Sequence, residues 1–365
     1  MKMKKIVVFS PVDWRWIKQR PQFLAEELSS YCTVSVIYPW RNRRKGLQAK
    51  SPSPVQIHPY FTVPEFGGRI PLLKKWNRFA SKAQIAKYLS EEKPNYLWLT
   101  MPWQIDLIPE NLDCEIVYDC MDDYASISMQ SNMREQIWQQ ERRLTEAAKF
   151  IFASSAHLAD LLNERFSLPA GKVHLLRNGY SADWTIQSPC AALDSSALRF
   201  GYFGTIGRWF DFELILKSLE ACPQLEYHLF GPTENGVSVP QNPRIISHGV
   251  VEHRAIPKLA EQMDALVMPF IPNEIVQSVD PVKLYEYICL NKPILCIRYP
   301  EVERFAPFAI LYAGQDEYIR AVSSVDKERA PRYTQQQAAA FLEKNSWAVR
   351  AKEVVLHMQL NKMED

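Results

Sequence analysis

The chain has 365 residues, of which 47% are hydrophobic and 23% charged, the composition of an ordinary soluble globular protein. This length exceeds what one hydrophobic core usually supports, so we expect two domains. The sequence contains no apolar run near the ~20 residues of a membrane span, and its first apolar segment is too short for a signal peptide. These features predict a cytoplasmic protein.

The formal net charge of +2 hides an asymmetry. Residues 1–180 carry 25 Lys and Arg against 18 Asp and Glu, whereas residues 181–365 carry 18 against 23. The basic excess is strongest in residues 1–93, with 18 basic and 6 acidic side chains. It predicts an anionic partner for the N-terminal half. We expect a membrane surface and no nucleic acid, because no nucleic-acid recognition motif accompanies the charge.

Strand-like apolar runs alternate with helical patterns in the first half. The runs lie at residues 4–10, 33–40, 95–102, 114–120, 150–155 and 173–179. Runs this apolar are typical of strands covered on both faces, as in parallel sheets. The alternation predicts a doubly wound, Rossmann-like α/β domain over residues 1–180.

The segment after the first strand, PVDWRWIKQRPQFLAEEL, lacks the glycine fingerprint of a dinucleotide-binding domain, which argues against NAD or FAD. Its aromatic and polar side chains could line an acceptor pocket, because aromatic faces suit sugar rings. The acceptor-binding candidates in this segment are Trp14, Arg15, Gln19 and Arg20. Asn178, at the end of the last strand of this half, is a further candidate. Tryptophans that only pack the domain are the alternative.

The segment VYDCMDDY puts three carboxylates at a strand end. Asp119 closes the strand, and Asp122 and Asp123 follow it. A carboxylate in this position suits a general base for an acceptor hydroxyl, so we take Asp119 and Asp122 as catalytic candidates. Asp123 could instead cap a following helix. The seven cysteines show no metal-binding spacing, and we expect no metal site.

Residues 181–197, rich in Ser, Ala and Pro, predict an interdomain linker. Strand-like runs then resume at 198–204, 225–231, 244–250, 265–270, 293–298 and 309–314. They predict a second doubly wound domain over residues 198–345, with a cleft between the domains at the carboxyl ends of the strands. A helical tail follows from about residue 334.

Several strands of the second half end in glycine or other special residues. A glycine there lets the backbone approach a phosphate or a sugar closely. The candidates at these ends are Gly204, Thr205, Gly231, His248, Gly249, Pro269 and Phe270. Together they predict one nucleotide pocket.

The segment DPVKLYEY adds a helix start to this pocket. Asp280 suits an N-cap and Pro281 the first helical position, which puts Lys283 and Glu286 on one face. Free N–H groups and the lysine predict a diphosphate site, and the glutamate could accept two hydrogen bonds from a ribose diol. Leu284 completes the donor-binding candidates. The alternative is a capped surface helix with an ion pair.

The order of VYDCMDDY, RNGY, GTIGRWFDFELI and DPVKLYEY resembles GT-B-fold glycosyltransferases, in particular the teichuronic-acid-type enzymes of bacterial surface polysaccharides. The resemblance covers essentially the whole chain. It implies a nucleoside-diphosphate sugar donor, a glycan or lipid-linked acceptor and no cofactor. It also implies that residues 346–365 form a helix crossing back to the N-terminal domain. Lys283 and Arg208 would stabilise charge on the leaving diphosphate, although Arg208 could be a solvated loop residue.

Two positions depart from the family pattern. Asn291 stands where the turn after the nucleotide helix usually has glycine, and asparagine tolerates the left-handed conformation needed there. Many retaining members have a glutamate eight residues before the one at Glu286, where this chain has Ser278. The stereochemistry therefore stays open. A nucleotide-sugar 2-epimerase and a non-catalytic nucleotide-sugar-binding subunit are the rival hypotheses.

The segment RIPLLKKWNRFASKAQIAKYLSEE has helical spacing of apolar residues with basic residues between them. The apolar positions are Leu72, Leu73, Trp76, Phe79, Ala83 and Ala86, and the basic ones are Lys74, Lys75, Arg78 and Lys82. This pattern predicts peripheral attachment to anionic lipid on the inner face of the membrane. The alternative is that the apolar stripe is core and the basic residues form a solvated face.

Overall fold

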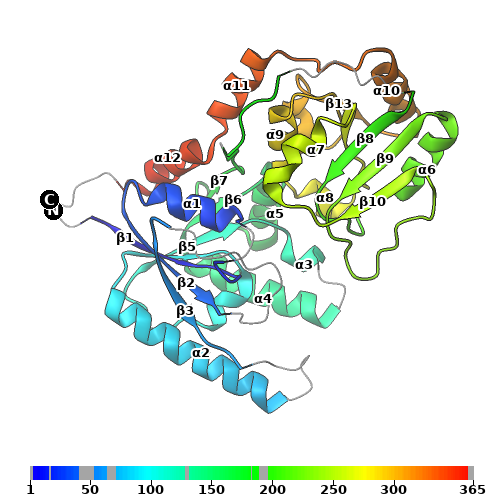
Figure 1. Cartoon of the computed structure of the whole chain (residues 1–365). Coiled ribbons are helices and arrows are strands. Elements are labelled where there is room, and N and C mark those ends of the chain that lie inside the picture. The colour runs from blue at the N-terminus through cyan, green and yellow to red at the C-terminus, as the bar shows by residue number, and fades with distance from the viewer. Residues whose placement is uncertain are drawn as a thin grey trace. The chain divides into compact units, whose positions relative to one another are not determined.

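The structure is a computed structural model that describes residues 3–15, 18–40, 53–63, 71–127, 131–181, 183–188 and 196–360. The chain forms two compact units. Met1–Asn178 together with Trp347–Asp365 make the first, and Gly179–Ser346 make the second (Figure 1). Each unit has its own parallel sheet and its own hydrophobic core, which confirms the predicted α/β class with two Rossmann-like domains.

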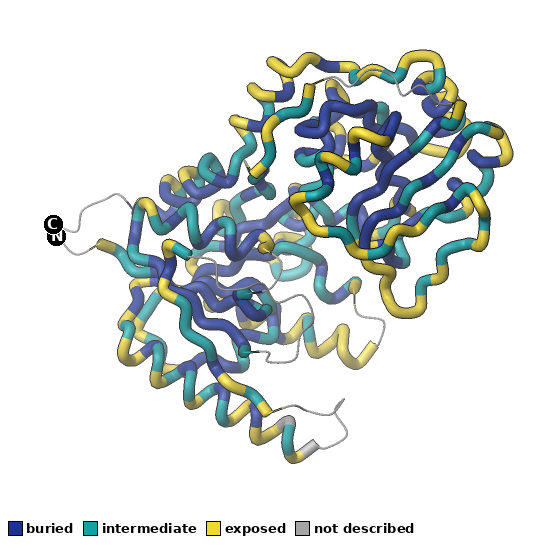
Figure 2. The backbone as a smooth tube through the Cα atoms, viewed as in Figure 1, coloured by how far each residue is buried: buried dark blue, intermediate teal, exposed yellow. Residues whose placement is uncertain are grey.

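The first unit is built on a seven-stranded sheet with the order β3-β2-β1-β4-β5-β6-β7. The strands are β1 (Lys5–Phe9), β2 (Thr33–Pro39), β3 (Gln56–Tyr60), β4 (Tyr96–Leu99), β5 (Glu115–Cys120), β6 (Ala148–Ala153) and β7 (Val173–Leu175). The strand order reverses between β1 and β4, and such a switch point is where doubly wound sheets bind ligands. The central strands are buried along nearly their whole length (Figure 2).

Helices cover both faces of this sheet, since successive side chains of β4 enter different cores. Trp98 packs in the cluster formed with α1 (Arg20–Leu28) and α12 (Trp347–Met358). Leu97 packs in the cluster formed with α2 (Pro71–Glu92), α4 (Ser131–Ala147) and α5 (Ala156–Phe166). Two short elements follow β4 and β5, the 3-10 helix η2 (Pro102–Asp106) and α3 (Tyr124–Ile127). The last helix of the chain therefore completes the core of the first unit.

The second unit has a six-stranded parallel sheet with the order β10-β9-β8-β11-β12-β13. The strands are β8 (Leu198–Phe203), β9 (Leu225–Phe230), β10 (Ile245–Gly249), β11 (Ala265–Met268), β12 (Ile294–Ile297) and β13 (Ile310–Tyr312). The helices are α6 (Phe212–Ala221), η3 (His253–Ala255), α7 (Ile256–Ala260), α8 (Glu274–Gln277), α9 (Val282–Cys289), η4 (Pro300–Phe305), α10 (Gln315–Lys327) and α11 (Gln335–Lys344). One hydrophobic cluster joins both faces.

The predicted linker is not a separate segment, because its described residues belong to the second unit. The Gln187 N–H donates to the Cys289 carbonyl at 2.9 Å. The Tyr180 hydroxyl also lies 2.9 Å from Cys289 Sγ, which holds the start of the segment against the same unit. Among the helices that the structure describes, none is long and apolar enough to cross a bilayer.

Candidate functional site

Helix α9 starts one residue later than the sequence predicts. Its first residue is Val282, and Pro281 is the N-cap. Asp280, the predicted cap, is fully buried, and its carboxylate forms an ion pair with Arg304. Lys283 is therefore the second helical residue. It still lies one turn before Glu286, as the sequence predicts.

The Lys283 amine lies where β8 and β9 end beside the start of α9. Its Nζ is 5.9 Å from the centre of the Tyr202 ring. Gly204 follows β8 with φ +145°, and a Cβ there would come within 2.1 Å of the Lys283 Cε. Gly231 follows β9 with φ +149°, and a Cβ there would lie 2.0 Å from the Gly204 carbonyl oxygen. Close approach and backbone angle together require glycine at both positions.

The electrostatics of Lys283 suit an anionic ligand. Burial lowers the pKa of its amine, and the Glu286 carboxylate one turn away opposes this effect. Among the described residues the ammonium has no hydrogen-bond or ion-pair partner. A helix start with free N–H groups beside such an ammonium is a site for a phosphate group.

Glu286 is engaged by a residue that the sequence analysis missed. His253 Nε2 lies 2.9 Å from Glu286 Oε1, and this hydrogen bond raises the pKa of His253. The imidazole also stacks on Trp184, with ring centres 4.5 Å apart and planes 25° apart. The three residues come from the segment before β8, from η3 and from α9. No periodicity connects these segments, so the sequence carries no signal for the cluster.

The ends of β8, β9 and β10 form one edge. The Gly204 N–H donates to the Phe230 carbonyl at 2.8 Å, and the Gly231 N–H donates to the Gly249 carbonyl at 2.7 Å. His248 stacks on Phe230 with ring centres 4.2 Å apart. The structure thus brings together the four predicted donor-binding residues at these strand ends.

The other predicted donor contacts are of two kinds. Pro269, Phe270 and Leu284 have buried side chains, so only their backbone could meet a ligand. Thr205 is exposed in the loop after Gly204.

Arg208 lies further along this loop, where its backbone N–H donates to the Glu234 carboxylate at 3.2 Å. This contact fixes the loop through the Arg208 backbone. The predicted role of the Arg208 guanidinium, stabilising charge on the leaving diphosphate, stays a hypothesis.

In the first unit, Asp119 has a structural role that contradicts the prediction of a general base. It is fully buried at the end of β5 and accepts hydrogen bonds from Arg20 Nη2 at 2.7 Å and Nε at 3.0 Å. Arg20 Nη1 also donates to Asn178 Oδ1 at 3.1 Å. Arg20 and Asn178, predicted to bind the acceptor, therefore tie α1 and β5 to the segment after β7.

The remaining acceptor candidates divide between core and surface. Trp14 is 8% exposed and packs in the core, which is the alternative that the sequence left open. Arg15 pairs with Asp13 at 2.8 Å, and its guanidinium lies 3.7 Å from the centre of the Trp40 ring. Gln19, the N-cap of α1, is exposed and remains a candidate.

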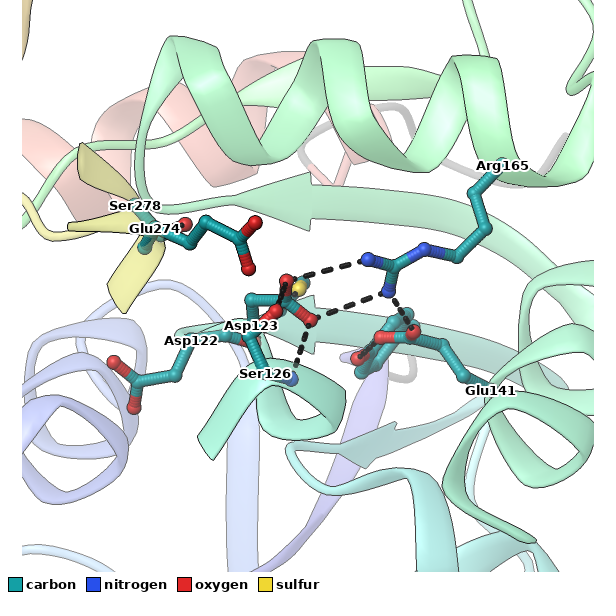
Figure 3. A network of polar contacts seen from close by, with 9 residues as sticks. Asp122, Asp123, Ser126, Glu141, Arg165, Glu274 and Ser278 are labelled. Atoms are coloured by element: carbon teal, nitrogen blue, oxygen red, sulfur yellow. Dashed lines mark hydrogen bonds and ion pairs between the residues drawn. The ribbon is translucent and has the colours of Figure 1, made fainter. Parts of the chain in front are cut away.

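Asp122 and Asp123 differ sharply in their surroundings (Figure 3). Asp123 pairs with Arg165 at 3.2 Å and accepts from the Ser126 hydroxyl at 2.6 Å. It also accepts from the Ser126 backbone N–H at 3.4 Å, which caps α3. The side chain of Asp122 points away from this network. Burial raises the pKa of Asp122 to about 7, with Arg20 lowering it and Asp123 raising it. Of the three acids, Asp122 has the properties of a base that works near neutral pH.

A cavity of about 710 Å³ in the first unit lies away from these residues, at the start of β5. Glu110, Asp113 and Glu115 line it, with Arg143 as the basic side chain. This acidic lining does not suit a nucleotide.

The chain matches no protein-family model. Over 248 residues it is 26% identical to a protein of Bacillus subtilis (strain 168) whose name assigns it to teichuronic acid biosynthesis as the glycosyltransferase TuaH. The alignment covers 63% of this chain and 62% of the relative, so the chain spans less than two thirds of that protein. The likeness confirms the predicted resemblance to surface-polysaccharide enzymes.

Solved structures align with nearly the whole chain. Sucrose-phosphate synthase from Thermosynechococcus elongatus has a TM-score of 0.69 at 13% identity, covering 98% of this chain and 99% of its own. The lipopolysaccharide outer core galactosyltransferase WaaB has 0.65 at 12%, covering 98% and 100%. Anabaena HepE in complex with UDP and glucose has 0.65 at 12%, covering 98% and 99%.

The chain has the GT-B fold. At these identities the likeness establishes architecture alone. Within this GT-B architecture, the second unit carries the glycine-rich strand ends and the lysine at the start of α9.

Proposed function

We propose that the chain is a glycosyltransferase. It would move a sugar from a nucleoside-diphosphate sugar to a glycan or lipid-linked saccharide in bacterial surface polysaccharide synthesis. The observation that carries the proposal is the ammonium of Lys283 at the start of α9, which lies close to Gly204 and has no hydrogen-bond or ion-pair partner in the described part of the chain. The relative named for teichuronic acid biosynthesis supports the polysaccharide context.

The donor contacts follow from this geometry. The diphosphate binds the N–H groups at the start of α9 and the Lys283 ammonium. Glu286 accepts hydrogen bonds from the ribose diol, oriented by His253 at 2.9 Å. As the bond between the sugar and the diphosphate breaks, negative charge grows on the leaving oxygen. Lys283 stabilises that charge in the transition state.

The acceptor side needs a group that takes up the hydroxyl proton. Asp119 is occupied by Arg20, and Asp123 by Arg165, which leaves Asp122 among these acids. With its pKa raised to about 7, its carboxylate can accept a proton near neutral pH. A lipid-linked acceptor would bring the reaction to the inner face of the cell membrane.

Calorimetric titration with UDP, GDP and dTDP and with their free nucleosides tests the donor site. For the nucleobase that these titrations select, Glu286→Gln should weaken binding of the nucleoside and of the nucleoside diphosphate alike. The reason is that charge-assisted hydrogen bonds of roughly 1.5–3 kcal/mol each are lost. Lys283→Ala weakens the diphosphate and leaves the free nucleoside nearly unchanged. It also slows transfer more than it weakens donor binding.

Lys258→Ala and Glu261→Gln are the matched controls, because both residues are exposed in the second unit with the same spacing. Wild-type nucleotide affinity in both α9 variants would refute the donor site. Product analysis separates the rival on the same fold, since a 2-epimerase returns an altered nucleotide sugar without any acceptor.

A further inference from the structure

One face of α2 exposes large apolar side chains to solvent. Leu72 is 77% exposed, Trp76 53% and Phe79 75%. Their spacing of four and three residues puts them on one side of the helix, and the exposed Ala83 continues the same line. We call these four residues the α2 stripe. Large apolar side chains gathered on one face of a helix mark an interaction surface, unlike scattered single ones.

The opposite face of α2 explains why the stripe cannot be core. In the first half of the helix the inward positions are polar, and Asn77 and Ser81 are each 3% exposed. Asn77 exchanges hydrogen bonds with the backbone of Val63 at 2.9 and 2.7 Å. Ile85 and Leu89 take over the inward face in the second half. The usual pattern of apolar inside and polar outside is therefore inverted at the start of this helix.

The segment after β3 extends the apolar surface. Phe61 is 56% exposed and Val63 39%. The backbone of Phe61 exchanges hydrogen bonds with the Gln84 side chain at 3.0 Å in both directions. Both residues are thus fixed beside α2 by side chains of that helix, and we call them and the α2 stripe together the patch.

The charged side chains that α2 itself contributes beside this patch are basic, and one of them, Arg78, pairs with Asp106 at 3.2 Å. Lys75 and Arg78 are exposed, and Lys82 is half-buried on the same stretch of α2. In the sequence, α2 has no acidic residue before Glu91. Apolar anchors flanked by cations fit a surface that is apolar inside and anionic outside.

We propose that this patch docks onto an anionic lipid bilayer. Leu72 and Phe79 enter the boundary between headgroups and acyl chains, and Trp76 lies at headgroup level. Lys75 and Lys82 bind the lipid phosphates. A polar partner such as nucleic acid would leave the exposed leucine and phenylalanines without burial. The inference concerns a surface of the first unit and does not depend on the proposed donor site.

Co-sedimentation of the full chain with phosphatidylcholine vesicles, with and without phosphatidylglycerol, tests the proposal. We expect binding to the anionic vesicles that weakens with added salt, because salt screens the charges. Lys75→Glu with Lys82→Glu lowers the affinity by at least roughly fivefold for each lysine. Leu72→Ser with Phe79→Ser abolishes binding. None of these four residues is buried, so circular dichroism should show an unchanged fold.

The matched controls lie on α12 of the same unit. Leu356 is 77% exposed, as Leu72 is, and Lys352 is also exposed. Leu356→Ser and Lys352→Glu should bind vesicles like the wild type. Equal binding by the wild type and both α2 pairs would overturn the proposal. A wild-type dimer in light scattering that Leu72→Ser with Phe79→Ser converts to a monomer would instead make the patch a contact between two copies.

Brominated lipids give a second readout, because they quench only tryptophans that reach the bilayer. We expect quenching of the wild type in anionic vesicles and its loss in Trp76→Phe, which retains binding through the other anchors. Quenching that persists unchanged in Trp76→Phe would overturn the assigned orientation of α2.

Discussion

Gly204 and Gly231 have nearly the same φ angle, but an added Cβ would meet different obstacles at the two positions. A Cβ at Gly204 would meet the end of the Lys283 side chain, which can move. A Cβ at Gly231 would meet the carbonyl of Gly204, which is part of the backbone where β8 ends. Gly204 therefore leaves room for the Lys283 amine, and Gly231 lets the backbones at the ends of β8 and β9 approach closely.

This difference predicts different main effects for two alanine variants. Gly204→Ala should weaken nucleoside diphosphate binding, because Lys283 is displaced, with a stability loss set mainly by backbone strain. Gly231→Ala should lower the free energy of unfolding by more than the roughly 1–3 kcal/mol of backbone strain. Urea unfolding and calorimetric titration measure the two effects.

Gly236→Ala is the control for strain alone, because Gly236 has φ +87° and open space around its Cβ position. If Gly231→Ala unfolds at the same urea concentration as Gly236→Ala, the close approach of Gly231 to the Gly204 carbonyl contributes nothing to the loss of stability.

The acids after β5 illustrate what a sequence cannot rank. Asp119, Asp122 and Asp123 lie within five residues, and all three suit a strand end facing a ligand. Their roles depend on Arg20, 99 positions from Asp119, and on Arg165, 42 positions from Asp123. Each arginine occupies one acid, and only the folded chain reveals which acid remains.

Asp122 should show its raised pKa in two measurements. If it is the base, transfer needs its ionised form, so kcat/KM rises with pH through about 7 and levels off above it. Asp122→Asn should lower transfer by roughly 10²–10⁴-fold without changing nucleotide affinity.

Ionisation of Asp122 should affect folding stability in the opposite direction to activity. A carboxyl with a raised pKa holds its proton longer in the folded state than in the unfolded state. Folding stability from this group therefore falls as pH rises from about 4 to about 7.

Asp122→Asn should consequently unfold at a higher temperature than the wild type at pH 8, with the difference shrinking towards pH 4. Asp160→Asn, at an exposed position on α5, is the control and should show no such trend. A wild-type rate that is flat from pH 6 to pH 8 would exclude Asp122 as the base.

At the scale of elements, burial decides what the sequence reveals. The buried strands were predicted from their apolar runs, whereas β3 was missed. It lies at the edge of its sheet, has half-exposed side chains and contains Pro59, so it lacks both signals of a strand. Helix α10 was missed although the signal is present. Its buried residues have helical spacing, at Tyr318, Ala321, Val322 and Val325.

The two ends of α9 were predicted with different success. At the C-terminal end, Asn291 has φ +53°, which confirms the left-handed turn expected of asparagine. Its Nδ2 also donates to the Gln187 carbonyl at 3.0 Å. At the N-terminal end, Asp280 pairs with Arg304, 24 positions away, and the helix begins after Pro281. The C-terminal cap at Asn291 depends on local backbone conformation, so the sequence predicts it. The N-terminal cap depends on whether the Asp280 carboxylate bonds the helix or a distant arginine, and the sequence does not predict that choice.

At the scale of the whole molecule, the order of elements does not match the order of units. The chain completes the second unit at Ser346 and then returns to the first through α12. The aromatic ring of Trp347 stacks on Phe23 of α1 with ring centres 5.3 Å apart. Val354 and Val355 pack in the same cluster as Trp98 of the sheet. The core of the first unit is thus incomplete until the end of the chain is made.

This arrangement predicts different behaviour of two fragments. Residues 179–346 contain their whole sheet and cluster, so they should fold alone and unfold cooperatively. They should also bind the nucleoside diphosphate, because every proposed donor contact lies within them. Residues 1–178 lack α12 and should not fold stably alone, since each large apolar side chain missing from the core costs roughly 1.5–3 kcal/mol.

Adding a peptide of residues 347–360 should restore cooperative unfolding to the 1–178 fragment, in a concentration-dependent way. The same peptide with Trp347→Ala should be much weaker, because the stack with Phe23 is lost. Leu356→Ser is the control in the peptide, because Leu356 is 77% exposed and lies outside the core. A 1–178 fragment that unfolds as cooperatively without the peptide as with it would mean that α12 covers a core already complete.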